Sequence, residues 1–208
     1  MMKKLFALFF AVFVVASVHA QEAPDAMVQR VTEEVLDLIR KDADIQNGST
    51  HKVIELIDKK VLPNFNFQHM TGLAVGKDWK RASAPQQVQL VTEFRTLLVR
   101  TYANALTSYK NQKVIFKPTK MNPGDTDVLV RTEVAQSGSK PIQLDYNLER
   151  LDTGWKVYDV TVAGISLVTN YREQFAQEVR NGGIDGLIAS LAAKNKSLES
   201  GQAKAEKK

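Results

Sequence analysis

The side chains that could do chemistry in this chain are few, and their spacing does not suit catalysis. After residue 20 there are two histidines, His51 and His69, and neither belongs to an HExxH or HxH pattern, so the sequence offers no zinc ligand set. The chain has no cysteine, which excludes a thiol nucleophile, a thiolate metal site and disulfides. It also lacks a P-loop, a GxGxxG pattern and a GxSxG pattern. The sequence therefore predicts no metal and no cofactor.

The remaining candidates for catalysis are His69, Tyr146, Tyr158 and Asp159. Tyr146, Tyr158 and Asp159 lie in strand-like segments and could line a cavity of a sheet, although tyrosine is also a common strand residue. Asp145 alternates toward the other face, which argues against a carboxylate pair. His69 stands among apolar residues, as a polar group at a pocket rim or as an ordinary surface or core histidine. We therefore do not expect an enzyme.

Residues 1–20 have the pattern of a signal peptide. Lys3 and Lys4 precede an apolar run over residues 5–16, and small residues lead up to Ala20. The run is too short to span a bilayer comfortably, so an uncleaved anchor is the weaker alternative. Cleavage after Ala20 would leave an exported chain that begins at Gln21. A cysteine-free exported protein fits a bacterial periplasm, and the absence of cysteine excludes a lipoprotein anchor.

The charge of the chain is only mildly positive. Removing Lys3 and Lys4 with the leader lowers the formal net charge from +5 to +3. This charge is compatible with weak attraction to anionic lipid surfaces and is far from that of a nucleic-acid-binding protein. Two roles are open for the segment Trp79-Lys80-Arg81. Either it contacts lipid headgroups or a partner protein, or Trp79 packs while Lys80 and Arg81 stay in water.

Four segments of the first half repeat apolar residues every three or four positions, which is the spacing of one helix face. They cover residues 25–41, 50–62, 64–76 and 84–108. Ser83 and Gln86 have the spacing of a capping box at the start of the last and longest helix.

Four later segments, 113–117, 127–135, 142–151 and 155–162, have strand composition and short turn-like connections, which predicts an antiparallel meander. Gly164 then serves as a hinge and Ser166 as the N-cap of a helix over residues 167–180. A short helix follows at 184–193 after Gly182 and Gly183, and residues 194–208 form a flexible charged tail. The sequence predicts one α+β domain over residues 21–193, with helices on one face of the sheet.

Several segments carry a more specific signal. They are Phe65-Asn66-Phe67-x-x-Met70-Thr71, Trp79-x-x-Ala82-Ser83, Thr101-Tyr102, Val157-Tyr158-Asp159-Val160, Gly164-Ile165-Ser166-Leu167-Val168 and Asn170-Tyr171-Arg172-x-x-Phe175. With them, the chain resembles the MlaC family, also called toluene-tolerance or ABC-transporter auxiliary-component proteins, from about residue 26 to about residue 191. One departure is Ala163, which precedes Gly164 where an acidic residue is expected.

The resemblance implies a periplasmic phospholipid carrier that serves outer-membrane lipid asymmetry in Gram-negative bacteria. Its expected partners are phospholipid, an inner-membrane ABC transporter complex with an MCE-domain ring, and an outer-membrane lipoprotein–porin complex; nucleic acid is not expected, and the chain is expected to be a monomer. The fold implied is a cone like that of nuclear transport factor, with a curved antiparallel sheet of about four to five strands and about six to seven helices around an apolar cavity. Both acyl chains would enter the pocket and the headgroup would stay at its mouth.

The apolar pattern and the resemblance together predict which residues line the pocket. On β-strand alternation, Tyr158, Val160 and Val162 share one face, and Val157 points the other way under a covering helix. The predicted lipid-binding residues are Phe67, Met70, Leu73, Phe94, Leu98, Tyr102, Leu106, Val130, Leu144, Tyr146, Leu148, Tyr158, Val160, Val162, Val168 and Tyr171. Two other hypotheses stay open: an exported cone-fold enzyme that uses Tyr158, Asp159 or His69 on an apolar substrate, and an envelope scaffolding protein without a ligand.

Overall fold

The computed structural model describes residues 22–107, 109, 112–135, 138 and 140–205. The expected signal peptide at residues 1–20 lies outside the described residues, as do Ser108 at the expected end of one helix and the last three residues of the expected tail. Within the part of the chain that is described, no helix combines the length and the apolar character needed to cross a bilayer.

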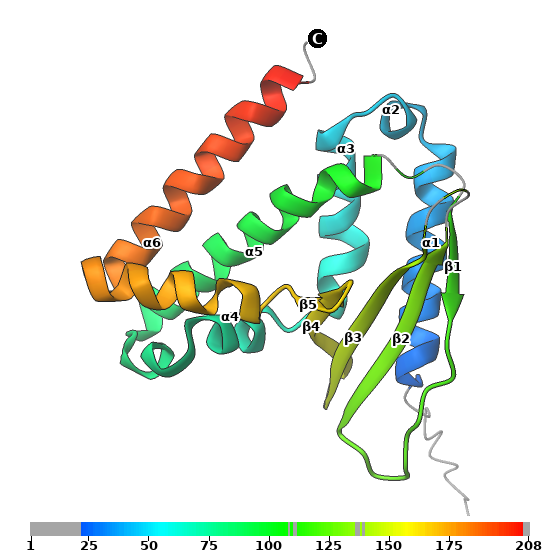
Figure 1. Ribbon diagram of the computed structural model, residues 1–208, viewed down its shortest axis with the longest axis horizontal. Coiled ribbons are helices and arrows are strands. Elements are labelled where there is room, and N and C mark those ends of the chain that lie inside the picture. Colours follow the sequence, from blue (N-terminus) through cyan, green and yellow to red (C-terminus); the bar gives the residue numbers. More distant parts are fainter. Residues whose placement is uncertain (1–21, 108, 110–111, 136–137, 139, 206–208) are drawn as a thin grey trace, which may run out of the picture.

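Six α-helices and five strands build the described part of the chain (Figure 1). The helices are α1 (Pro24–Lys41), α2 (Ala43–Gln46), α3 (Thr50–Leu56), α4 (Phe67–Val75), α5 (Ala84–Thr107) and α6 (Arg172–Ala205). The strands are β1 (Lys113–Phe116), β2 (Asp127–Ala135), β3 (Ile142–Leu151), β4 (Gly154–Val162) and β5 (Ile165–Ser166). The described chain also forms a π-helical turn at Ile57–Val61 and 3₁₀ turns at Leu62–Asn64, Gly76–Arg81 and Thr169–Tyr171.

Helix ends in the first half follow the local chemistry of the sequence. The capping box of α5 forms as predicted: the Gln86 backbone N–H donates to Ser83 Oγ at 3.4 Å, and the Ser83 N–H donates to Gln86 Oε1 at 2.9 Å. The predicted helix over 50–62 begins as α3 and loosens into the π-helical turn before Pro63. Trp79 packs on α4, because its ring lies 3.4 Å from where a Cβ on Gly72 would sit.

The sheet is an antiparallel meander with the strand order β1-β2-β3-β4-β5. The four predicted strands and the α+β class are confirmed, and the short strand β5 is an addition. One face of the sheet is covered by α1 (Figure 1), whose Met27 and Val28 pack against Val128, Val130 and residues of β3 and β4. The helices α4 and α6 lie on the opposite side of the molecule from α1 and β1, and α5 runs from them toward α3 and α1 (Figure 1), where Val99 and Ala103 pack with Val35 and Ile39.

A β-bulge in β4 corrects one prediction. Val157 pairs with Leu148 of β3, and the pairing then shifts register, so that Tyr158 is the extra residue of β4. Because a bulge reverses the alternation of side chains, Val157 and Val160 pack in the same apolar cluster while Tyr158 packs against the helices. Val160 and Val162 share a cluster as predicted, but the predicted placement of Tyr158 with them and of Val157 opposite is wrong.

The helix predicted over residues 167–180 begins later than expected, at Arg172. Ser166 belongs to β5, and its Oγ accepts hydrogen bonds from the Val168 and Thr169 backbone N–H groups at 3.2 and 3.0 Å. The hydroxyl thus caps a turn, as its type suggests, and a 3₁₀ turn separates that cap from α6.

Helix α6 breaks at Gly183 and then continues to Ala205. The break agrees with the predicted stop, since Gly183 has a φ of 68°. After it, α6 turns back along α5 (Figure 1): Asn195 Nδ2 donates to the Glu93 carbonyl at 2.9 Å, and Gln202 Nε2 donates to the Arg100 carbonyl at 3.0 Å. The described residues beyond 193 are therefore helical and bound to α5, where the sequence predicts a flexible tail.

The buried apolar side chains form three clusters. The helical cluster contains Met70, Ala74, Val75, Ala82, Leu90, Phe94, Leu97, Leu98, Val168, Phe175, Val179, Leu187 and Leu191. The sheet cluster contains Met27, Val28, Val128, Val130, Leu148, Trp155, Val157 and Val160. The N-terminal cluster contains Val35, Ile39, Ile45, Val53, Ile57, Val99, Ala103 and Tyr109.

Candidate functional site

The three apolar clusters meet only through half-buried side chains among the described residues. Phe65 and Leu167 pack against both the helical and the sheet cluster, and Val31 packs against both the sheet and the N-terminal cluster. A domain of this size usually has one contiguous core. We call the border between the helical and the sheet cluster, marked by Phe65, Leu167 and Tyr158, the helix–sheet seam.

The predicted lipid-binding residues divide by burial into two groups. The buried group fills the clusters: Met70, Phe94, Leu98 and Val168 in the helical cluster, and Val130, Leu148 and Val160 in the sheet cluster. The half-buried group lies at cluster edges: Phe67, Leu73, Tyr102, Tyr158 and Tyr171 against the helical cluster, Tyr146 and Val162 against the sheet cluster, and Leu106 against the N-terminal cluster. Leu144 is half-buried and packs in none of the three clusters.

Half-buried tyrosines bring neutral phenols to the cluster edges. Burial raises the pKa of Tyr102, of Tyr146 and of Tyr171. For Tyr171 the neighbouring Tyr102 phenol raises the pKa further. These phenols therefore stay uncharged at neutral pH, and they add aromatic rings rather than charges to the edges of the clusters.

Three aromatic rings fix the start of α6 against α5. Phe94 meets Tyr171 edge-on at a centroid distance of 5.3 Å and Phe175 edge-on at 5.2 Å. Edge-to-face pairs at these distances are favourable beyond the area that they bury. The contacts hold Tyr171 at the edge of the helical cluster.

A polar group on the sheet binds the start of α4. Asn66 caps α4 by accepting the His69 backbone N–H at 3.1 Å, and its Nδ2 donates to Glu149 Oε1 at 2.8 Å. His69 Nδ1 lies 2.8 Å from the same oxygen of Glu149. A carboxylate only accepts, so His69 donates from Nδ1. Glu149 of β3 thus joins two residues of the α4 N-terminus to the sheet.

The bulged residue Tyr158 extends this polar group. Its ring stacks on His69 with a centroid distance of 4.6 Å, and its hydroxyl donates to Asp127 Oδ2 at 2.7 Å. Burial, followed by the hydrogen bond to Asp127, raises the pKa of Tyr158. The phenol therefore stays protonated at neutral pH, when it donates to Asp127.

The candidate catalytic residues are brought only partly together. His69 and Tyr158 stack, but Asp159 is buried and serves the turn that follows β4: its Oδ2 accepts from Ser166 Oγ at 2.6 Å, and its Oδ1 accepts from the Val168 N–H at 3.3 Å. Tyr146 lies apart, at the edge of the sheet cluster. These contacts give each residue a structural partner and form no nucleophile–base pair.

Four residues of the seam and of the polar group are missing from the predicted site: Phe65, Asn66, Glu149 and Leu167. Phe65 and Asn66 stand in a segment that carries the family resemblance, which was a usable signal. Glu149 has the alternation of an outward polar residue, so the sequence gives no sign that it binds α4. Among the described residues, no group of three or more His, Asp or Glu is placed to hold a metal ion.

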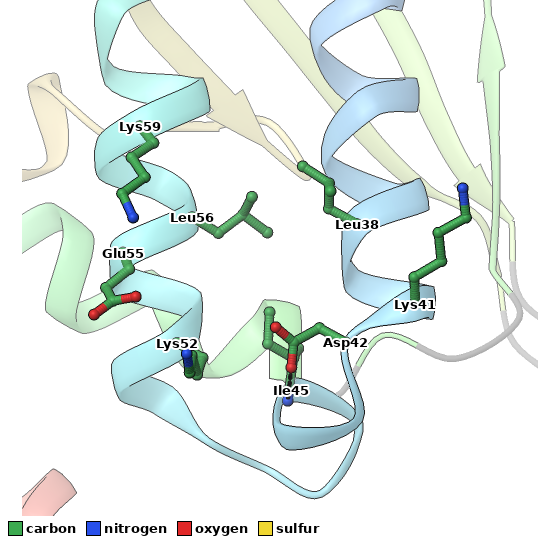
Figure 2. A pocket seen from close by; sticks show the side chains of 8 residues that line it. All are labelled: Leu38, Lys41, Asp42, Ile45, Lys52, Glu55, Leu56 and Lys59. Atoms are coloured by element: carbon green, nitrogen blue, oxygen red, sulfur yellow. Dashed lines mark hydrogen bonds between the residues drawn. The ribbon is translucent and has the colours of Figure 1, made fainter.

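Two surface hollows lie away from the seam. The larger, of about 350 Å³, lies between α1, α2 and α3, and in Figure 2 Leu38 and Leu56 point toward each other across it. Lys41, Lys52 and Lys59 also line it. A volume of this size is at the low end of the range for drug-sized ligands. The smaller hollow, of about 220 Å³, adjoins Met27 and Trp155. None of the predicted lipid-binding residues lines either hollow.

Comparisons with known proteins agree on one family. The chain is 24% identical over 184 residues to the intermembrane phospholipid transport system binding protein MlaC of Haemophilus influenzae, a match that covers 87% of this chain and 86% of that protein. It is 27% identical over 176 residues to the toluene tolerance protein ttg2D of Pseudomonas putida, covering 84% and 81% of the two chains.

A solved structure is similar over most of this fold. It is the phospholipid-binding protein from Ralstonia solanacearum in complex with a phospholipid, with a TM-score of 0.81 and 38% identity, covering 86% of this chain and 99% of that one. The model of the MlaC protein family matches residues 29–193. With the helix-covered antiparallel meander and the strand–turn–helix segment after Trp155, these matches show that the chain belongs to the MlaC family.

Proposed function

We propose that this protein is a periplasmic phospholipid carrier that moves lipid between an outer-membrane lipoprotein–porin complex and an inner-membrane ABC transporter complex with an MCE-domain ring. The observation that carries the proposal is the division of the apolar core into three clusters joined only by half-buried side chains among the described residues. Half-buried apolar residues that border one another are available to contact acyl chains without giving up the packing inside each cluster.

The wall for the acyl chains is proposed to consist of the half-buried group of predicted residues. They come from α4, α5, β3, β4 and the turn before α6, and they bring aliphatic groups and neutral phenols to half-buried positions. Tyr146 combines a pKa raised by burial with a partly exposed side chain, which is what a residue of a crevice wall would have. The buried group is proposed to form a second layer that supports this wall.

A carrier needs an apolar site and no catalytic group. Burying a CH₂ group is worth roughly 0.8 kcal/mol, so two acyl chains of about sixteen carbons gain on the order of 25 kcal/mol relative to water. A bilayer offers nearly the same gain. Transfer between a membrane and an apolar site of this kind is therefore close to balanced, while release into water is prevented.

Transfer between vesicles tests the proposal. Donor vesicles of phosphatidylethanolamine and phosphatidylglycerol carry a fluorescent phospholipid, and acceptor vesicles carry none; the chain from Gln21 onward is added at increasing concentration. We expect the transfer rate to rise in proportion to protein, with no lysophospholipid or free fatty acid formed. Transfer that is independent of protein would refute the carrier, and hydrolysis products that disappear with Asp159→Asn would favour the exported enzyme.

A further inference from the structure

We propose that Asn66, His69 and Glu149 form a clasp that holds α4 closed over the helix–sheet seam, and that opening this clasp sets the rate at which phospholipid enters and leaves. This inference rests on the proposed function. It assigns to these residues a positioning role: they control access to the apolar site and do not contact the acyl chains.

The clasp lies between the two aromatic residues that are best placed to cover the seam. Phe65 and Phe67 flank Asn66 in sequence, and their rings stack at a centroid distance of 5.7 Å. Phe65 packs against both the helical and the sheet cluster, and Phe67 packs against the helical cluster. A backbone movement that lifts Asn66 from the sheet therefore carries both rings with it.

Besides the clasp, the His69–Tyr158 stack and the packing of Phe65 against the sheet cluster, two hydrogen bonds hold this corner to the sheet. The Asn66 backbone N–H donates to the Val157 carbonyl at 2.8 Å, and Lys156 Nζ donates to the Pro63 carbonyl at 2.6 Å. The side chain of His69 is 38% exposed and that of Glu149 is 21% exposed. Water can therefore solvate the polar groups when the clasp opens, so opening does not bury an unsatisfied charge.

Two neighbouring carboxylates of the sheet require hydrogen-bond donors at the clasp. Asp127 and Glu149 are direct cross-strand partners in β2 and β3, and like charges in this position repel. Tyr158 donates to Asp127, whereas Asn66 and His69 donate to Glu149, so each carboxylate is stabilised by donors in the closed state. Lys156 is the cross-strand partner of Glu149 on the β4 side, and Asp159 of β4 is engaged by Ser166.

A donor–acceptor exchange tests the clasp. Asn66→Asp keeps an N-cap oxygen for α4 but turns the contact with Glu149 into a like-charge contact. The double variant Asn66→Asp/Glu149→Gln restores the pair with donor and acceptor exchanged, and the neutral His69 ring then accepts at Nδ1 in its other tautomer. Each protein is loaded with fluorescent phospholipid, and the loss of fluorescence to excess unlabelled vesicles gives the release rate. We expect Asn66→Asp to release lipid about tenfold faster, since losing a hydrogen bond worth about 1.4 kcal/mol changes a rate about tenfold. The double variant should return to within about twofold of the unmodified protein.

The control is Glu34→Ala, which removes the partner of Lys60 in an ion pair between α1 and the π-helical turn, outside the clasp. It should leave the release rate unchanged. Glu149→Ala is the second clasp variant, and faster release with retained lipid would support the clasp even if Asn66→Asp folds poorly. Loaded variants whose release rates equal that of Glu34→Ala, or a double variant that shows no recovery, would overturn the clasp alone. Failure of the unmodified protein to load any phospholipid would overturn the proposed function and the clasp with it.

Discussion

Leu144 and Leu148 provide a matched pair that separates a seam wall from a filled core. Both belong to β3 and lie four residues apart, so they point to the same face of the sheet. Leu148 is 0% exposed in the sheet cluster, whereas Leu144 is half-buried and packs in none of the three clusters. Replacing each by aspartate places the same charge in two different surroundings.

The expected effects differ in kind. Leu148→Asp loses about 1.5–3 kcal/mol of apolar burial and buries an unpaired carboxylate at several kcal/mol more, a large part of a total stability of about 5–15 kcal/mol. Leu144→Asp loses about half that apolar term, or about 0.8–1.5 kcal/mol, because Leu144 is half-buried and the new carboxylate can reach water. The melting temperature of Leu144→Asp should therefore fall by only about 2–6 °C. Bound phospholipid should fall at least tenfold, since a charge in the wall opposes an acyl chain by more than about 1.4 kcal/mol.

Circular dichroism melting and phosphate analysis of extracted lipid measure both effects on the same samples. We expect Leu148→Asp to be unfolded, and Leu144→Asp to be folded and depleted of phospholipid. If Leu144→Asp unfolds as Leu148→Asp does, the position is core and the reasoning about half-buried residues is wrong. If it folds and keeps its full phospholipid, β3 does not contribute to the wall.

Three further predictions concern stability. Ala163 adopts a φ of 49° in the two-residue turn between β4 and β5, a conformation that asparagine tolerates better than alanine. Ala163→Asn should therefore raise the melting temperature by about 2–4 °C and leave the lipid content unchanged. A lower melting temperature would contradict this. Folding raises the pKa of Tyr158 above the ordinary tyrosine value of 10.0, so its stabilising contribution is complete below pH 10 and is lost as pH rises beyond it. The stability of the unmodified protein should consequently decline more steeply above pH 10 than that of Tyr158→Phe in urea titrations; parallel declines would argue against the shift. Ser83→Ala removes the capping box of α5 and should lower stability by about 1 kcal/mol without changing lipid content, which a calorimetric melt checks.

Local chemistry explains what could be predicted from the sequence. The strands alternate apolar and polar residues and are separated by turn residues, so the meander follows from neighbours along the chain. The capping box at Ser83 and the break at Gly183 likewise depend on one or two residues. Features of this kind are specified by short segments and are recovered from them.

The bulge at Tyr158 could not be predicted, because it depends on register against β3. Nothing in the types of Val157, Tyr158 and Asp159 shows that one of them lacks a partner. The bulge turns Tyr158 toward His69 and Asp127, so the polar group at the start of α4 was missed along with it. The division of the predicted pocket residues into buried and half-buried groups depends in the same way on tertiary packing.

The composition at the end of α6 is compatible both with a flexible tail and with a helix. Lys, Ala, Glu and Ser are common in flexible tails, and Lys, Ala and Glu are also good helix formers. The contacts of Asn195 and Gln202 with α5 decide between the two, and they join residues that are 102 positions apart. The departure at Ala163 was visible in the sequence, but only the positive φ shows that the turn favours asparagine or aspartate there.

Native mass spectrometry of the purified chain from Gln21 onward shows directly whether the folded protein carries phospholipid. We expect one phospholipid per chain, identified by mass and by its fragments after release, and loss of this lipid in Leu144→Asp. A folded protein that stays free of phospholipid after incubation with phosphatidylethanolamine and phosphatidylglycerol vesicles would contradict this expectation.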